Sequence, residues 1–162
     1  IESQEPHFVE LRDGRVMMLF RTYSGHVGRA DSEDRGQTWS KGEIIEELKL
    51  PMNSSALHVS RIPSTGDLLL VRSIGNGGQE AGEMPRVFNR GTGNKHYIRT
   101  PLTSIISRDE GETWENERII AGAPYGDFGY PSVLHLGDLA LVSYHALDGL
   151  HIARIQPGWF YE

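Results

Sequence analysis

Short apolar runs separated by polar turns follow one another along the chain. The run 15–23 is rich in Val, Met, Leu and Phe, and it follows Asp13-Gly14, a dipeptide that favours a tight turn. The runs 68–72 and 139–144 likewise begin at turns that contain Gly and Asp. Nineteen Gly and eight Pro are spread between the runs, as expected of many turns rather than of helices. The pattern predicts antiparallel hairpins and an all-β fold.

One order of segments recurs and predicts a repeated unit. Two strands joined by a turn are followed by a third strand, an octapeptide and a fourth strand, and the order restarts near residue 56. Units that cannot bury both apolar faces alone must stack, and radial stacking of four-stranded sheets makes a β-propeller. We expect about three four-stranded antiparallel blades in one domain, 1–162, the third without a clear fourth strand. The expected blade boundaries are 5–50, 51–125 and 126–162.

Two octapeptides share the form Ser-x-Asp-x-Gly-x-Thr-Trp. In each, the Asp carboxylate can accept hydrogen bonds from backbone N–H groups of a turn, Gly can take a conformation closed to other residues, and Trp can pack between sheets. The spacing is not that of a calcium-binding EF-hand loop, so we expect a structural role without catalysis or metal. The motif residues are Ser32, Asp34, Gly36, Thr38 and Trp39 in the first copy, and Ser107, Asp109, Gly111, Thr113 and Trp114 in the second.

Composition narrows the expected partners. The formal net charge of −6 offers no basic surface for a phosphate backbone, so nucleic acid is not an expected partner. No apolar run is long enough to cross a bilayer, and without Cys there is neither a disulfide nor a thiolate metal site. The seven His lack the spacing of a zinc site, so we expect neither metal nor cofactor. The first residues are neither a signal peptide nor an initiator Met, so we expect a piece of something longer.

The octapeptide is the Asp box of sialidases and of other propellers with bacterial neuraminidase repeats. The resemblance to sialidases covers nearly the whole chain, as their C-terminal half, and it implies a six-bladed propeller. The segment 5–11, with the following turn and Arg21, is similar to the family segment that carries a catalytic glutamate and a carboxylate-binding arginine. The resemblance therefore implies that Glu5 is catalytic and that Arg21 binds substrate.

Two further segments resemble the sialidase site. Residues 99–103, which run into the second Asp box, are similar to the segment that supplies another arginine of the triad, and this implies a substrate-binding role for Arg99. Residues 129–132 resemble the segment with the tyrosine nucleophile, which implies that Tyr130 is catalytic. The chain departs from the family pattern in placing Pro131 directly after Tyr130 and in having His145 where a glutamate is frequent.

The chemistry explains why these residue types belong together. A sialic acid is an anionic 2-keto sugar, and a planar guanidinium binds a carboxylate through two parallel charge-assisted hydrogen bonds. A neutral phenol can approach that sugar where a carboxylate nucleophile would be repelled, and sialidases are the known tyrosine exception among glycosidases. A phenol has a pKa of about 10, so Glu5 is expected to accept the proton of Tyr130 during attack. The implied activity is exo-hydrolysis of a terminal acidic sugar, sialic acid or a similar one.

The family site has members that this chain does not match. The first triad arginine and the acid/base aspartate lie toward the N-terminus of the full-length enzymes. Arg61 precedes Ile62-Pro63 as in the first of these motifs, but it stands before a turn inside a middle blade, and we do not assign it a catalytic role. Asp127 is read as a turn residue. Missing N-terminal blades, or a second copy of the chain, are expected to close the ring.

Other interpretations stay open. Arg21 can be a salt-bridged edge charge and Tyr130 a packing aromatic, and Asp-box propellers also serve as non-catalytic carbohydrate-binding or scaffold domains. The Gly-rich stretch 75–97 is read as a long loop, and the residues 159–161 as an apolar anchor for a neighbouring blade. The resemblance favours a secreted or periplasmic location, whereas the composition leaves the cytoplasm open.

Overall fold

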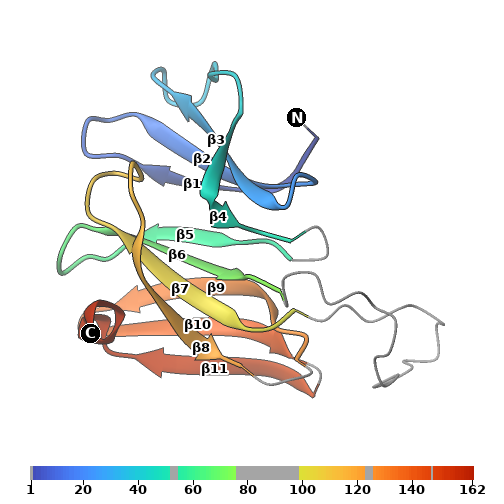
Figure 1. Ribbon diagram of the computed structural model, residues 1–162. Helices are drawn as coiled ribbons and strands as arrows, with labels where there is room; N and C mark the ends of the chain where they lie inside the picture. The colour runs from blue at the N-terminus through green and yellow to red at the C-terminus, as the bar shows by residue number, and fades with distance from the viewer. Residues whose placement is uncertain (1, 52–54, 76–98, 123–125, 147) are drawn as a thin grey trace.

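Three antiparallel sheets, stacked face against face, form the described part of the chain (Figure 1). The computed structural model describes residues 2–51, 55–75, 99–122, 126–146 and 148–162. Within each sheet the strands lie in chain order, and we call the sheets blades 1, 2 and 3.

Blade 1 consists of β1 (Ser3–Glu10), β2 (Val16–Thr22), β3 (His26–Ser32) and β4 (Glu43–Lys49). Blade 2 consists of β5 (His58–Arg61), β6 (Leu68–Ser73), β7 (Leu102–Ser107) and β8 (Glu115–Ala121). Blade 3 consists of β9 (Gly129–Leu136), β10 (Leu139–Ala146) and β11 (Gly149–Ile155), followed by the 3₁₀ helix η2 (Pro157–Tyr161).

The predicted all-β, blade-like fold is confirmed. Blade 3 has three strands in the described residues, as the incomplete third repeat suggested. The first strand begins at Ser3, earlier than the apolar run at Phe8, because polar residues at its start pair with the end of β2. Most of the Gly-rich stretch 75–97, which we read as a loop, lies outside the described residues.

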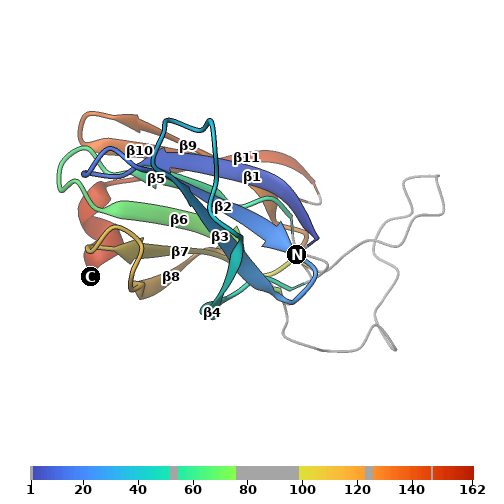
Figure 2. The same cartoon turned by 90° about the horizontal axis from the view of Figure 1, so that it is seen from above.

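The first strand of each blade lies next to the first strand of the adjacent blade. Strand β1 contacts β5, and β5 contacts β9, so the three first strands are neighbours across the blades. All three run in the same direction, from the side where the N-terminus lies toward the opposite side (Figure 1). Figure 2 shows the same stack from above. The blades therefore share one end where their first strands begin and another where these strands stop.

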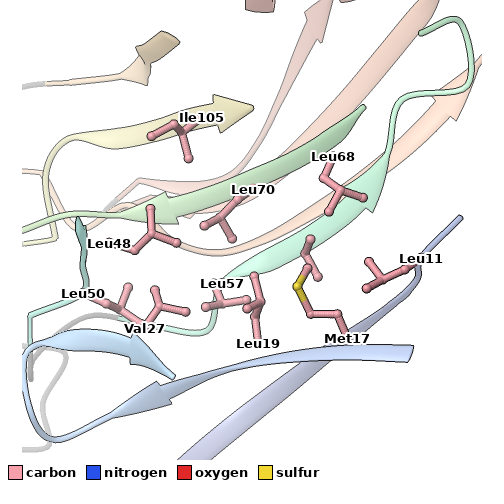
Figure 3. Close-up of a cluster of buried hydrophobic side chains, with 11 residues drawn as sticks. Leu11, Met17, Leu19, Val27, Leu48, Leu50, Leu57, Leu68, Leu70 and Ile105 are labelled. Carbon is pink, nitrogen blue, oxygen red and sulfur yellow. The ribbon is translucent and has the colours of Figure 1, made fainter. Parts of the chain in front are cut away.

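A hydrophobic cluster joins blades 1 and 2 (Figure 3). Met17 and Leu19 project from one face of β2 toward Leu68 and Leu70 of β6, and all four side chains are fully buried. This arrangement follows from the period of two along a strand, which sends alternate side chains to one face. Burial of each such side chain contributes about 1.5–3 kcal/mol.

A second cluster joins blades 2 and 3. Leu69 and Val71 leave the opposite face of β6 and meet Val142 and Tyr144 of β10. Every residue of β6 is buried, which explains why this strand reads as a continuous apolar run instead of an alternating one. Phe160 of η2 is completely buried in the same cluster, and η2 contacts β7 and β8. The aromatic segment 159–161 thus anchors the end of the described chain to blade 2.

Each Asp box closes the turn between the third and fourth strands of its blade. Asp34 Oδ1 accepts a 2.8 Å hydrogen bond from Thr38 N, and Oδ2 accepts a 2.6 Å bond from the Thr38 hydroxyl. Asp109 and Thr113 make the same two bonds with the same lengths. The hydrogen bond from the Thr38 hydroxyl is the main reason that the pKa of Asp34 falls to about 2. The carboxylates are thereby committed to their turns.

The two Trp residues of the boxes differ in their surroundings, although the sequence predicted the same core role for both. Trp114 is partly buried against the cluster between blades 1 and 2. Trp39 is also partly buried, but its ring lies 5.6 Å from that of Phe8, which is 53% exposed. Within the described residues no second blade lies against Trp39, and its predicted packing between sheets stays a prediction.

The described residues contain neither a helix that could span a membrane nor a cluster of metal-ligating side chains. None of the helices there has the length and apolar character needed to span a bilayer. Within the same residues, no cluster of three or more His, Cys, Asp and Glu side chains is arranged to hold a metal ion.

Candidate functional site

Strand direction places the four candidate residues at one end of the blades. Glu5 and Tyr130 lie at the starts of β1 and β9, and Arg99 precedes β7, which runs parallel to β5 within blade 2. Arg21 lies at the end of β2, and its Cα pairs with that of Gln4. The Asp boxes follow β3 and β7, so they lie at the opposite end of the blades. The end that carries the candidates is called the site end below.

Glu5 and Arg21 form the first part of the site. Arg21 Nε lies 3.3 Å from Glu5 Oε2, and the two side chains are 15% and 28% exposed. Arg21 Nη2 also donates to Gln4 Oε1, and Gln4 Nε2 donates to the hydroxyl of Tyr23. Glu5 Oε2 is buried and has no hydrogen-bond partner of standard geometry in the described residues. A partly buried carboxylate oxygen with this acceptor capacity can take a proton from an incoming group.

Arg99, Asp127 and Tyr130 form the second part. Arg99 Nη1 lies 3.3 Å from Asp127 Oδ1, and the two side chains are 12% and 11% exposed. The Arg99 guanidinium carbon lies 5.5 Å from the centre of the Tyr130 ring, within cation–π range. The ring itself is accessible, since Tyr130 is 53% exposed. The structure therefore brings one predicted arginine beside the predicted tyrosine.

The backbone of the tyrosine is held by the segment that leads into β5. Tyr130 N donates a 2.9 Å hydrogen bond to the hydroxyl of Ser55, which is completely buried. A Cβ atom at Gly129 would lie 2.8 Å from the same hydroxyl oxygen, so only glycine fits this close approach. Ser55 thus connects blade 2 to the start of blade 3 next to the candidate nucleophile.

Glu5 and Tyr130 share an unusual backbone conformation. Their φ angles are +54° and +51°, and each is followed by a proline. In both strands two residues oppose one on the neighbouring strand, Glu5-Pro6 opposite Phe20 and Tyr130-Pro131 opposite Tyr144, which defines a β-bulge. Positive φ costs a residue with a side chain on the order of 1–2 kcal/mol. Bulges and such strain are frequent beside functional sites, where they re-aim a side chain.

The departure at Pro131 has a structural counterpart within the chain. Because Glu5-Pro6 adopts the same bulge without difficulty, a proline after Tyr130 is compatible with this geometry. Pro131 itself is buried, whereas the tyrosine before it faces solvent. The bulge therefore lets the chain bury the proline and present the phenol.

Some of the surrounding residues were not found from the sequence. Asp127 was read as a turn residue, but it is 8% exposed and pairs with an arginine that lies 28 positions earlier. Ser55, Gln4 and Tyr23 gave no sequence signal, because a hydroxyl or amide that supports a site across blades has no characteristic spacing along the chain. The buried Gly129 beside Tyr130 was the one available hint.

Arg61 lies at the end of the blades opposite the site end. We assigned it no catalytic role from the sequence. Its Nη1 and Nη2 atoms each lie 2.8 Å from one carboxylate oxygen of Glu110, next to the second Asp box. The Arg61 hydrogen bond lowers the pKa of Glu110. This guanidinium supports the structure away from the site end.

Histidines occupy the three first strands. The rings of His7 and His58 lie 4.8 Å apart, and His135 Nε2 lies 3.0 Å from the Ser60 hydroxyl. Burial, with a smaller effect of the neighbouring His7 and His135, lowers the pKa of His58 to about 4. The Nδ1 atoms of His58 and His135 are both buried without a hydrogen-bond partner in the described residues.

Comparisons with known proteins point to one family. The model of a family described as BNR repeat-like domain matches residues 2–144. The K499G mutant of NanB sialidase from Streptococcus pneumoniae superposes with a TM-score of 0.69 and 17% identity, over 95% of this chain and 23% of that one. A leech intramolecular trans-sialidase complexed with 2,7-anhydro-Neu5Ac gives 0.64 and 17%, over 94% and 23%. An exo-β-1,3-galactanase from Phanerochaete chrysosporium gives 0.60 and 10%, over 100% and 37%.

These similarities have a defined reach. This chain spans about a quarter of the length of the sialidase structures that it resembles. Comparison with curated protein sequences gave no match. At such identities the structural likeness establishes the fold, whereas chemistry has to be argued from the site itself.

Proposed function

This chain belongs to the BNR repeat-like domain family, and we propose that it supplies part of the active site of a sialidase-like glycoside hydrolase. The substrate would be a terminal acidic sugar, sialic acid or a similar one. One observation carries the proposal: two arginines, a glutamate with a buried carboxylate oxygen and an accessible phenol occur at the same end of three stacked blades. A cationic site next to an exposed phenol suits an anionic sugar.

The arginines would hold the substrate carboxylate. Arg21 and Arg99 come from blades 1 and 2, and both side chains are largely buried, so their guanidinium groups have few conformations to lose on binding. A guanidinium carries five N–H donors and can therefore serve its own acid and a ligand carboxylate together. Lysine, a single point charge on a flexible stem, would orient the sugar less well.

Tyr130 and Glu5 would carry out the covalent step. The phenol oxygen forms a bond to the anomeric carbon while the bond from that carbon to the leaving oxygen breaks, and Glu5 accepts the phenol proton. A general acid from outside this chain protonates the leaving oxygen. Water then attacks the anomeric carbon and gives a proton back to the external acid, while the bond from that carbon to the Tyr130 oxygen breaks and Glu5 returns its proton to this oxygen. Glu5 Oε2 is buried, lies 3.3 Å from Arg21 Nε and accepts no hydrogen bond of standard geometry in the described residues, which supports its assignment as the base.

Further blades would complete the site. Blade 3 exposes Leu134, Leu150 and Ile152, and blade 1 exposes Phe8, so apolar side chains lie on both outer faces of the stack. Exposed apolar faces of this kind are usually covered. We propose that other blades of a longer chain, or a second copy of this one, cover them and supply the acid and the remaining arginine.

Turnover of a fluorogenic sialoside by the complete protein that carries this chain tests the proposal. Tyr130→Phe removes the nucleophile and should lower kcat on the order of 10³-fold. Tyr161→Phe is the matched control, because the Tyr161 hydroxyl bonds to Thr65 and Asp67 at the opposite end of the blades. Equal activity of the Tyr130→Phe variant and the unmodified protein would remove the proposed nucleophile. Mass spectrometry of the product then separates hydrolysis from an intramolecular transfer.

A non-catalytic carbohydrate-binding propeller is the second candidate. It is favoured by one observation: Asp127, the acid nearest to Tyr130 in its segment, is buried in an ion pair and poorly placed to act as a general acid. Under this alternative the complete protein binds a sialoside, Arg21→Ala and Arg99→Ala each weaken binding, and no turnover occurs. Calorimetry with free sialic acid, run beside the turnover assay, distinguishes the two functions.

A further inference from the structure

Arg99 is fastened to the segment 126–128 by its backbone as well as by its side chain. Arg99 N donates a 2.9 Å hydrogen bond to Gly126 O, and Phe128 N donates a 2.8 Å bond to Arg99 O. The backbone of Arg99 therefore pairs with the segment 126–128, and Arg99 and Asp127 form an isolated parallel β-bridge. The carboxylate of Asp127 adds the 3.3 Å contact to Arg99 Nη1. This double attachment fixes both ends of the arginine side chain.

The attachment extends to the tyrosine ring. A Cβ atom at Gly129 would lie 3.4 Å from Arg99 Cδ, so the arginine stem runs close along the backbone before Tyr130. The guanidinium then lies 5.5 Å from the centre of the Tyr130 ring. Any rotation of the guanidinium away from Asp127 would change its position relative to both the ring and a bound ligand.

Burial gives the Asp127 contact its effect. Both side chains are nearly inaccessible, so the pair is screened by water much less than a surface pair. A guanidinium that is already paired with one carboxylate attracts a second carboxylate less strongly than an unpaired guanidinium would. Its orientation is fixed, however, so its other N–H donors point in one direction. Such pre-organisation lowers the entropy cost of ligand binding.

We propose that Asp127 is a positioning residue that fixes the Arg99 guanidinium for a ligand carboxylate and keeps it over the Tyr130 ring. The proposal rests on the function proposed above. It adds Asp127, which we read from the sequence only as a turn residue, to the residues of the site. Asp127 is not the general acid in this arrangement; it acts through Arg99.

The first experiment separates binding from chemistry in the complete protein that carries this chain. Asp127→Ala removes the carboxylate contact of the guanidinium and should raise KM for a sialoside about tenfold, with kcat changed less than threefold. Asp127→Asn keeps an oxygen acceptor of the same length and should recover most of the affinity. Asp13→Asn is the matched control, since Asp13 is ion-paired to Arg15 at 2.7 Å in the turn at the opposite end, and it should change neither constant. A KM for Asp127→Ala within twofold of the unmodified value overturns the proposal.

The second experiment does not depend on activity. NMR of the arginine side chains measures how fast the Arg99 guanidinium rotates, with Arg99→Lys identifying its signals. Rotation should be hindered in the unmodified protein, faster in Asp127→Ala and still hindered in Asp127→Asn. Asp127→Leu, which also lacks an acceptor, takes the place of the Ala variant if that variant does not fold, and rotation should be faster in it as well. Unchanged rotation in a folded Asp127→Ala variant refutes the positioning role. If the protein neither binds nor cleaves sialosides, the proposed function fails, and this rotation measurement alone decides whether Asp127 positions Arg99.

Discussion

The two Asp boxes have the same internal hydrogen bonds but different neighbours. In both, the serine hydroxyl accepts a 2.8 Å bond from the glycine N–H, and the aspartate closes the turn onto the threonine. Beyond the turn the second box meets blade 1, since a Cβ at Gly111 would lie 2.9 Å from Met17 Sδ. A Cβ at Gly36 of the first box would meet only the ring of its own Trp39, at 3.7 Å. The turn is thus encoded locally, whereas the docking needs an adjacent blade.

The comparison extends to the charged residues around the boxes. Arg61, the last residue of β5, pairs with Glu110 of the second box, and Glu110 also accepts a 2.7 Å hydrogen bond from the backbone N–H of Arg12 in blade 1. Glu10, the last residue of β1, and Arg35 of the first box occupy the corresponding positions with the charges reversed. Glu10 and Arg35 both line an open pocket beside Phe8. The first box therefore has the residues for a similar connection, but within the described residues no second blade lies against it.

Replacement of the two tryptophans should show the largest difference between the boxes. Trp114→Ala removes a ring that packs on the cluster between blades 1 and 2 and should cost about 3 kcal/mol of unfolding free energy. Trp39→Ala removes a ring that contacts the exposed Phe8 and should cost about 1 kcal/mol. Urea unfolding of the two variants measures both values. Equal costs would mean that the Asp box Trp stabilises its own blade rather than the contact between blades.

The different fates of these tryptophans show which features could be predicted from the sequence. Hairpin turns and repeated octapeptides predicted the blades, because strands and tight turns depend on residues close together in the chain. The same octapeptide predicted a packed role for Trp39 and Trp114 alike, but the surroundings of the two rings differ, because the identity of a motif does not reveal which residues lie against it.

The site shows the same division between local and distant determinants. The order of the strands follows from the repeat, and it places Glu5 and Tyr130 at the site end. Their positive φ angles depend on bulges that form only when the neighbouring strands pair, so these angles could not be predicted from the sequence. The ion pair of Arg99 with Asp127 joins residues whose connection requires the folded blades. The resemblance to a family named the candidate residues, but the residues that contact them could be identified only from the structure.

Alanine at the two box glycines should give a smaller difference. Both glycines have positive φ, +87° at Gly36 and +85° at Gly111, so each substitution costs about 1 kcal/mol from backbone strain alone. Gly111→Ala also pushes a methyl group into Met17 of blade 1, and its total cost should reach about 2 kcal/mol. Thermal unfolding of the two variants measures the difference. A Gly36→Ala variant as unstable as Gly111→Ala would show that the first box is covered in solution, by a second copy or by a segment outside the described residues.

The smallest expected effect concerns Glu110 and has a defined pH dependence. The Arg61 hydrogen bond lowers the pKa of Glu110 below 4.5 in the folded protein, so the folded state binds fewer protons than the unfolded state as the pH falls through this region. The resulting stability is fully present above the unfolded pKa and is lost as the pH falls through the folded pKa.

Glu110→Gln should therefore cost about 1 kcal/mol at pH 7 and reduce the loss of stability below pH 4.5. Arg35→Gln, at the corresponding position of the first box, should change unfolding at neither pH. Urea unfolding at pH 7 and at a pH below 4.5 checks both variants, and a Glu110→Gln variant that keeps the full acid sensitivity of the unmodified chain would show that the hydrogen bond between Arg61 and Glu110 does not stabilise the fold.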